Sequence, residues 1–291
     1  MRHLMNVSHP RTAPALMALG AFFLVANDTF VKLYASHLPT NQIIVFRSLA
    51  TLACCILILW YRGTPLPNLR NRDLLIRTGF TIANVYAFVI ALVSLPFSLA
   101  VFIDLTNILF VALLAPIVLA ERLTFGKLAA VTIGMFGAGI MLSVEAVASG
   151  WLIIFPLISA FMGGCRELWT RKLGSEFSAV ALTVYASIGM VLVGICLGVG
   201  EWTFDDTQAL MAVLAAGLCH GVAMLLITTA LQWGEASFVA PFRLTSLLWA
   251  ALVAWIVFGE SFSPSQMFGA GLIICALLVL TLSPSRPRHQ P

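Results

Sequence analysis

Apolar residues follow one another along this chain in ten long runs, which are separated by short polar connections. A helix that crosses a membrane needs about 20 mostly apolar residues, and each run has about this length. The runs do not alternate between polar and apolar positions as the strands of a membrane β-barrel do. The pattern therefore predicts an all-α polytopic membrane protein with ten transmembrane helices, at about residues 15–33, 42–60, 75–94, 98–119, 125–143, 149–169, 179–198, 209–231, 236–258 and 265–282.

The connections between the runs hold turn-forming residues, such as Gly63 and Pro65 after the second run. Glycine and proline at such places end helices. The connections are too short for a folded domain outside the membrane. We expect residues 1–14 to form a cytoplasmic N-terminal tail rather than a signal peptide, and residues 283–291 to form a cytoplasmic C-terminal tail.

Composition supports the membrane class. Hydrophobic residues make up 60% of the 291 positions and charged residues 10%, and the mean hydropathy is +1.01. A soluble domain has about 25% charged residues, so a soluble globule of this composition would expose large apolar surfaces. This excludes intrinsic disorder and disfavours a soluble enzyme or a nucleic-acid-binding protein. The six cysteines lie in apolar runs without CxxC spacing, so the sequence predicts no metal site and no cofactor.

The basic residues predict the orientation of the chain, because cytoplasmic connections of membrane proteins carry an excess of Lys and Arg. With the N-terminus placed in the cytoplasm, twelve of the 16 Lys and Arg fall on cytoplasmic segments. Only Lys32 falls on the outer side, and three lie within spans. We therefore expect a multi-pass protein of the bacterial cytoplasmic (inner) membrane with both ends in the cytoplasm.

An internal repeat relates the two halves of the chain at a constant offset of 139 residues. The halves run from 15–143 and from 149–282, and each holds five spans. Five is odd, so the second half must be inverted relative to the first. Inverted repeats are typical of secondary transporters, whose site lies at the repeat interface. The pairs that match at this offset are Asp28 with Glu167, Lys32 with Arg171, Ser48 with Ser187, Ser98 with Ser237, and Glu121 with Glu260.

Short motifs in these halves resemble a known family. The segment Pro241-Phe242-Arg243, followed by Phe258-Gly259-Glu260, looks like the last-but-one helix of an EamA repeat, and Ala120-Glu121-Arg122 looks like the same element in the first half. The chain thus resembles the drug/metabolite transporter (DMT) superfamily, EamA type, over nearly its whole length. The resemblance implies ten helices in two inverted repeats around a central cavity. It also implies movement of small organic solutes such as amino acids, nucleotide-like compounds, vitamins or amphipathic drugs.

Six ionisable residues fall within the predicted spans. Such residues are costly in a bilayer and usually face a cavity or a partner, so each is a candidate for substrate binding or gating. Depth along the spans places three in the outer half and three in the inner half of the membrane. We expect two charged clusters that close the two mouths alternately, and the alternative is a set of static ion pairs between helices. The outer set is Asp28, Arg47 and Asp104, and the inner set is Arg166, Glu167 and Arg243.

Further residues are candidates for the lining of the cavity or for its motion. Glu121 and Glu260 close their spans, either as gates or as caps of the following helix. Gly163 and Gly164 could unwind their helix, and Pro241 could hinge its own. A small organic ligand needs a mostly apolar pocket with a few polar groups. The candidates for those groups are Asn84, Tyr86, Asn107, His220, Thr228 and Trp249.

These features together predict a secondary transporter that moves a small organic metabolite by alternating access. Uptake of a vitamin- or nucleoside-like compound and export of an amino acid, another metabolite or a drug are both open. The expected partners are the small-molecule substrate and the lipid bilayer, with no nucleic acid, and a homodimer and proton coupling are left open. ATP hydrolysis by this chain is disfavoured because there is no Walker motif. A membrane-embedded lipid enzyme fits less well because it would need an HExxH motif or a Ser/His/Asp set. A channel is the third alternative, and it too fits less well than a carrier.

Overall fold

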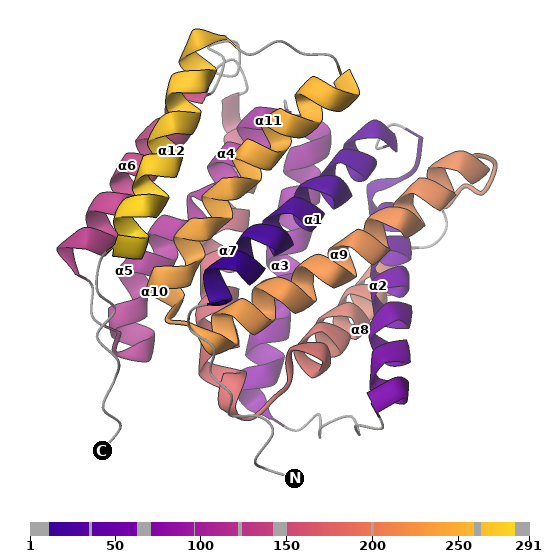
Figure 1. The fold of residues 1–291 in the computed structure, drawn as a ribbon. Helices are drawn as coiled ribbons and strands as arrows, with labels where there is room; N and C mark the ends of the chain where they lie inside the picture. The colour runs from indigo at the N-terminus through magenta and orange to yellow at the C-terminus, as the bar shows by residue number, and fades with distance from the viewer. Residues whose placement is uncertain are drawn as a thin grey trace.

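The computed structural model describes residues 12–34, 37–62, 71–95, 97–121, 124–141, 150–198, 201–258 and 263–282. Within these ranges the chain is helical and contains no strand (Figure 1). The α-helices are α1 (Ala13–Tyr34), α2 (Thr40–Arg62), α3 (Arg72–Ser94), α4 (Phe97–Leu105), α5 (Asn107–Leu119), α6 (Phe125–Met141), α7 (Ile154–Lys172), α8 (Ala179–Leu197), α9 (Thr207–Trp233), α10 (Ala236–Val239), α11 (Thr245–Phe258) and α12 (Pro264–Leu282).

Each of the ten predicted spans holds at least one helix in the part of the chain that the structure describes. Eight stretches are long and apolar enough to cross a membrane, and α6 and α12 hold shorter apolar helices. Polar caps explain why several helices begin before the apolar run. The Asn71 side chain, for example, accepts hydrogen bonds from the backbone N–H groups of Asp73 and Leu74 and so begins α3 at Arg72. The predicted fold class is therefore confirmed.

Two spans are broken at equivalent places in the two halves. α5 follows α4 after Thr106, and α11 begins at Thr245, 139 residues later, after the 3₁₀ segment η4 (Ala240–Leu244). The Thr106 hydroxyl donates to the Ile103 carbonyl at 2.6 Å, and the Thr245 hydroxyl donates to the Phe242 carbonyl at 2.7 Å. A hydroxyl bound to a carbonyl of the preceding turn competes with the helical hydrogen bonds. The repeat therefore carries the same local break in both halves.

The expectation that Gly163 and Gly164 would unwind their helix is wrong, because α7 is continuous through both residues. The two glycines instead allow neighbouring helices to approach closely. A Cβ atom on Gly163 would lie 3.1 Å from the amide nitrogen of Asn84, and one on Gly164 would lie 2.9 Å from the Cβ atom of Phe110. Small residues at helix contacts serve this purpose in membrane proteins. α7 thereby packs tightly on α3 and α5.

Contacts between helices join the two halves around an approximate two-fold axis. α1 packs along α9, and α7 packs along α3. These two contacts are equivalent under the repeat, since α1 and α7 begin their halves and α3 and α9 are the third spans. α2 packs on α8, and α6 packs on α12, which in each case joins two equivalent spans. In Figure 1 the pair α6 and α12 lies at the left edge of the bundle, and α2 and α8 lie at the right.

The beginning of α1 and the end of α12 lie on the same side of the bundle (Figure 1). We call this side, which carries Ala13 and Leu282, the terminal face, and we call the other side the opposite face. α1 runs from the terminal face to the opposite face. Five spans precede α7, so α7 runs in the reverse direction. The second half of the chain is therefore upside down relative to the first.

Candidate functional site

The six ionisable residues expected inside the spans are all buried, and each is exposed by 9% or less. They come from α1, α2, α4, α7 and η4, so both halves contribute. All except Glu167 line one cavity between the halves. Charges inside a bilayer usually face a cavity or a partner, and each of these six does at least one of the two. The set is Asp28, Arg47, Asp104, Arg166, Glu167 and Arg243.

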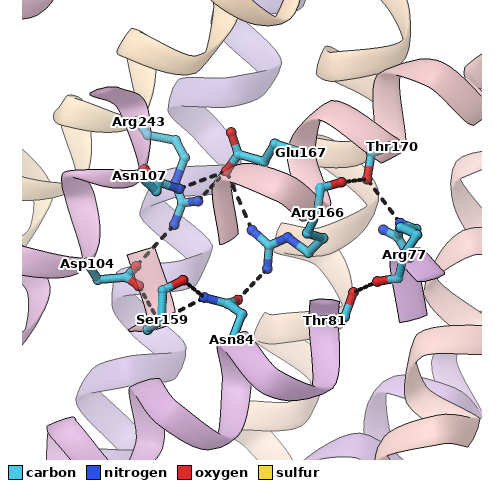
Figure 2. A network of polar contacts seen from close by, with 10 residues as sticks. All are labelled: Arg77, Thr81, Asn84, Asp104, Asn107, Ser159, Arg166, Glu167, Thr170 and Arg243. Atoms are coloured by element: carbon cyan, nitrogen blue, oxygen red, sulfur yellow. Dashed lines mark hydrogen bonds and ion pairs between the residues drawn. The ribbon is translucent and has the colours of Figure 1, made fainter. Parts of the chain in front are cut away.

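Arg243 joins carboxylates from both halves of the chain (Figure 2). Its Nη1 atom donates to Oε1 of Glu167 at 2.5 Å, and its Nη2 atom lies 3.8 Å from Oδ2 of Asp104. Glu167 is completely buried, so a carboxylate at this position needs a cation to offset its lost hydration. Asp104 and Arg243 each precede the threonine of their break by two residues. The two broken spans thus bring repeat-equivalent residues of opposite charge together.

Uncharged polar side chains extend this contact into a network (Figure 2). Arg166 donates from Nη1 to Oδ1 of Asn84 at 2.8 Å, and its Nη2 atom lies 3.5 Å from Oε1 of Glu167. The Asn84 amide donates to the Ser159 hydroxyl at 2.8 Å, and this hydroxyl donates to Asp104. The network joins α3, α4, α7 and η4. Each charged member has a partner of opposite charge or an amide, whereas Nε of Arg243 and Oε2 of Glu167 have no hydrogen-bond partner among the described residues.

The expected division into an outer and an inner cluster is wrong for this network. Depth along the spans places Asp104 in the outer set and Arg243 in the inner set, yet the two side chains face each other. Both residues lie near the middle of a broken span. From this position the long Arg243 side chain reaches Asp104, which its depth along the span had assigned to the other half of the membrane.

Asp28 and Arg47 lie at the same cavity but outside the network. Asp28 accepts a hydrogen bond from the neighbouring Asn27 amide at 2.7 Å. Neither Asp28 nor Arg47 forms an ion pair in the part of the chain that the structure describes.

The candidates for the cavity lining fall into two groups. Asn84 and His220 line the cavity, together with apolar residues of α1, α3, α4 and α9. The others are engaged elsewhere. Asn107 donates to Glu167 at 3.0 Å as part of the network, Tyr86 donates to Asn41 at 3.0 Å, and the Trp249 indole donates to the Ala18 carbonyl at 3.0 Å. Thr228 is buried and does not line the cavity.

The cavity has a volume of about 50 Å³, which holds a few water molecules. Pockets that enclose small organic ligands have volumes of roughly 300–1,000 Å³. The described conformation is therefore closed around its central site.

Glu121 is a helix cap, as one of the two interpretations of the sequence held, but it caps a different helix. Its carboxylate accepts hydrogen bonds from the backbone N–H groups of Ala236 and Ser237, each at 3.0 Å, and from the Ser237 hydroxyl at 2.7 Å. These groups begin α10 in the other half, not the following helix α6. The reason is that α10, which begins the ninth predicted span, packs against α5. The repeat-equivalent Glu260 lies outside the described residues, and Pro241 lies in η4 at the break.

Two buried basic residues were counted from the sequence among the twelve on cytoplasmic segments. Lys127 is 5% exposed and lies 2.6 Å from Glu235 and 2.9 Å from the Ser237 hydroxyl. Arg77 is 3% exposed and donates to the Thr170 hydroxyl at 3.0 Å and to a backbone carbonyl of α8. The spacing of the polar residues along α3 is a sequence signal that could have predicted the burial of Arg77. Residues 77, 81 and 84 share one face of α3, and Asn84 on that face faces the cavity.

The described ranges contain no group of three His, Cys, Asp or Glu side chains placed to hold a metal ion. Comparison with known proteins finds transporters of small molecules among those similar to this chain. The chain is 28% identical to a riboflavin transporter of Rhizobium johnstonii over 218 residues, which is 75% of this chain and 72% of that protein. It is 22% identical to an S-adenosylmethionine uptake transporter of Rickettsia prowazekii over 263 residues, which is 88% of each chain.

Structural comparison supports the same fold. A solved crystal structure superposes with a TM-score of 0.79 over 94% of this chain and 97% of its own, at 16% sequence identity. The model of the EamA-like transporter family matches residues 11–143 and 150–282, which are the two halves related by the repeat. The inverted helices, the charged network at their interface and these matches lead to one conclusion: the chain belongs to the EamA-like transporter family, and it carries two EamA domains.

Proposed function

We propose that this protein is a secondary transporter that carries a small polar organic metabolite across the cytoplasmic membrane by alternating access. The observation that supports this best is the buried network of Arg243, Asp104, Glu167 and Arg166 at the interface between the halves. Buried ionic contacts between two bodies are costly to break and costly to leave unpaired. They therefore favour discrete arrangements of the two halves over a continuously open pore.

Contacts at both faces support a closed intermediate of such a cycle. At the terminal face, Glu121 of the first half binds the beginning of α10 in the second half. At the opposite face, Gln42 donates to the Thr203 carbonyl and accepts from the Thr203 N–H at 3.0 Å, and His37 lies 2.7 Å from Asp206. Both faces are thus bridged between the halves while the cavity is small.

The terminal face is proposed to be cytoplasmic. The Lys and Arg positions favour this orientation, because the connections assigned to this face hold most of the basic residues. Riboflavin and S-adenosylmethionine, after which the relatives are named, are the first substrates to test, in the direction of uptake. Both are larger than the described cavity can hold, so binding requires the helices around it to separate.

Reconstituted vesicles test this proposal. We expect saturable uptake of a labelled metabolite, and faster uptake when the vesicles are loaded with the same unlabelled compound. Counter-transport of this kind arises in a carrier because the loaded site returns faster than the empty one. Flux that rises linearly with concentration and shows no counter-transport would contradict a carrier and favour a channel.

A further inference from the structure

Unpartnered polar atoms gather at the central cavity. In the described ranges, eight buried side-chain nitrogen or oxygen atoms have no hydrogen-bond partner. Buried polar groups are normally hydrogen-bonded, so a concentration of exceptions at one place calls for a ligand. Five of the eight belong to residues that line the cavity, namely Asn27, Arg47, His220, Arg243 and Ser246.

Arg47 is the charged residue of this group with the fewest contacts. It is 2% exposed, its Nε atom has no partner, and its guanidinium makes no hydrogen bond or ion pair with any described residue. The other two arginines at the cavity both contact Glu167. A buried guanidinium without an acceptor is costly, and this one lies at the wall of a cavity.

Asp28 is a buried carboxylate that complements the charge of Arg47 at the same cavity. Asp28 is 5% exposed, lines the same cavity and has only the Asn27 amide as a hydrogen-bond donor. Asp28 and Arg47 do not form an ion pair with each other or with another described residue. They therefore present an acceptor and a donor of opposite charge to one cavity.

The position of Arg47 is fixed by its backbone rather than by a partner of its side chain. The Thr51 hydroxyl, one turn further along α2, donates to the Gly217 carbonyl of α9 at 2.7 Å. Gly217 lies directly against the Arg47 backbone, where a Cβ atom would collide with it. This close approach of α2 and α9 holds Arg47 opposite α1, which also packs along α9.

We propose that Asp28 and Arg47 together bind the head group of a zwitterionic substrate, with an ammonium group against Asp28 and a carboxylate against Arg47. This inference rests on the proposed function and names the substrate class of the same cavity. A zwitterion neutralises both buried charges in one step, whereas a ligand with a single charge leaves the other charge unpaired in a medium of low polarity. The planar guanidinium donates two parallel hydrogen bonds to a carboxylate, which fixes the orientation of the head group.

Binding to the purified protein in lipid nanodiscs tests this assignment. The probes are the twenty common amino acids, S-adenosylmethionine and S-adenosylhomocysteine, measured by thermal shift and calorimetry. Each zwitterion that binds is compared with its carboxamide, which keeps only the ammonium group, and with its N-acetyl derivative, which keeps only the carboxylate. Methylthioadenosine and riboflavin serve as ligands without an amino-acid head group.

We expect at least one zwitterion to bind and each single-charge derivative to bind at least about 30-fold more weakly, as the loss of one partner of a buried charge contact implies. Arg47→Gln should weaken the zwitterion and not the carboxamide, and Asp28→Asn should weaken the zwitterion and not the N-acetyl derivative. Arg47→Lys and Asp28→Glu keep the charges and guard against a folding defect. Arg72→Gln, an exposed arginine at the start of α3, is the matched control and should leave binding unchanged.

Three results would overturn the head-group site. They are binding of no zwitterion in the panel, equal binding of a zwitterion and its carboxamide, and unchanged affinity in Arg47→Gln. Saturable riboflavin uptake together with any of these results would keep the transporter proposal and reject the zwitterion. Zwitterion binding with no counter-transport would keep the head-group site and reject the carrier.

Discussion

Lys32 and Arg171 make the same contact at opposite faces of the protein. Lys32 on α1 donates from Nζ to the carbonyls of Leu92 and Leu95 at the end of α3, at 2.9 and 3.1 Å. Arg171 on α7 donates from Nη1 to the Leu231 carbonyl at 3.4 Å and also to the next carbonyl at the end of α9. Leu231 follows Leu92 by the same 139 residues that separate Arg171 from Lys32. Each cation binds the last carbonyls of a helix, where the helix dipole favours positive charge.

These two contacts join the same two packed pairs of helices. α1 packs along α9, and α3 packs along α7. Lys32 therefore connects the pair α1–α9 to the pair α3–α7 at the opposite face, and Arg171 connects them at the terminal face. A motion that opens one face between the pairs must break one of the two contacts and can keep the other. The repeat thus places an equivalent contact between the two pairs of helices at each face, and we call these two contacts, of Lys32 and of Arg171, the latches.

The first prediction concerns these latches. Lys32→Gln should open the opposite face and Arg171→Gln should open the terminal face, because each removes a charge-assisted hydrogen bond of about 1.5–3 kcal/mol. The readout is labelling of Ser246→Cys, a cavity residue, by an impermeant maleimide applied from one side of oriented vesicles in a background without other cysteines. We expect roughly tenfold faster labelling from the opened side in each variant.

Lys172→Gln is the control for Arg171→Gln, since Lys172 is its neighbour on α7 and binds Asp73 at the surface at 3.0 Å. Labelling that rises equally from both sides in a latch variant would indicate general loosening of the fold and would contradict a role in one face alone.

The second prediction concerns the pair of Arg243 and Glu167. Arg243→Gln leaves the completely buried Glu167 without its strongest partner, so we expect a loss of about 3–5 kcal/mol in the free energy of unfolding. The double variant Arg243→Gln with Glu167→Gln should recover most of this loss, because it removes the unpaired charge as well. Thermal unfolding in detergent measures both effects.

Transport separates structural stabilisation from function in the same variants. If the pair serves only packing, the double variant should regain transport together with stability. We expect stability to return and transport to stay low. Full transport in the double variant would contradict a part for this pair in the transport cycle.

The spans and the repeat could be predicted from the sequence because they depend on local information. Runs of about 20 apolar residues identify the spans whatever their neighbours are. The constant offset between Asp28 and Glu167 and between Lys32 and Arg171 needs no structure to be seen. Burial of the six charges follows from their place in apolar runs. These features therefore agree with the structure.

The partners of those charges could not be predicted, because they depend on how helices cross. Glu121 is close in sequence to α6, yet it caps α10 more than 110 residues away. Arg77 lies near the beginning of its apolar run, so it was counted with the basic residues of the cytoplasmic segments. Its burial follows from the packing of α3 on α7 and α8, which only the three-dimensional arrangement reveals. The same applies to the contact between Asp104 and Arg243.

The third prediction concerns the cap on α10. Glu121→Ala removes the acceptor of two backbone N–H groups and one hydroxyl. We expect a loss of about 1–3 kcal/mol in the free energy of unfolding. Glu121→Gln keeps one acceptor oxygen and should lose less.

Glu176→Ala is the control, because Glu176 is bound to Asn71 at the surface and should change stability by at most about 0.5 kcal/mol. An equal effect of Glu121→Ala and Glu176→Ala would show that the cap contributes nothing.

The fourth prediction concerns pH at the opposite face, where Asp206 caps α9. The backbone N–H of Ala209 and the side chain of His37 both donate to this carboxylate, and they lower its pKa below the ordinary value. A carboxyl group with a lowered pKa stabilises the folded state above its ordinary pKa of about 3.9, and this contribution is lost as the pH falls through the lowered value.

Asp206→Asn keeps a capping oxygen but has no charge to lose. The melting temperature of the native protein should therefore exceed that of Asp206→Asn at about pH 5, and the difference should shrink toward zero below about pH 3. A difference that does not change between these pH values would show that the charge of Asp206 does not stabilise the fold.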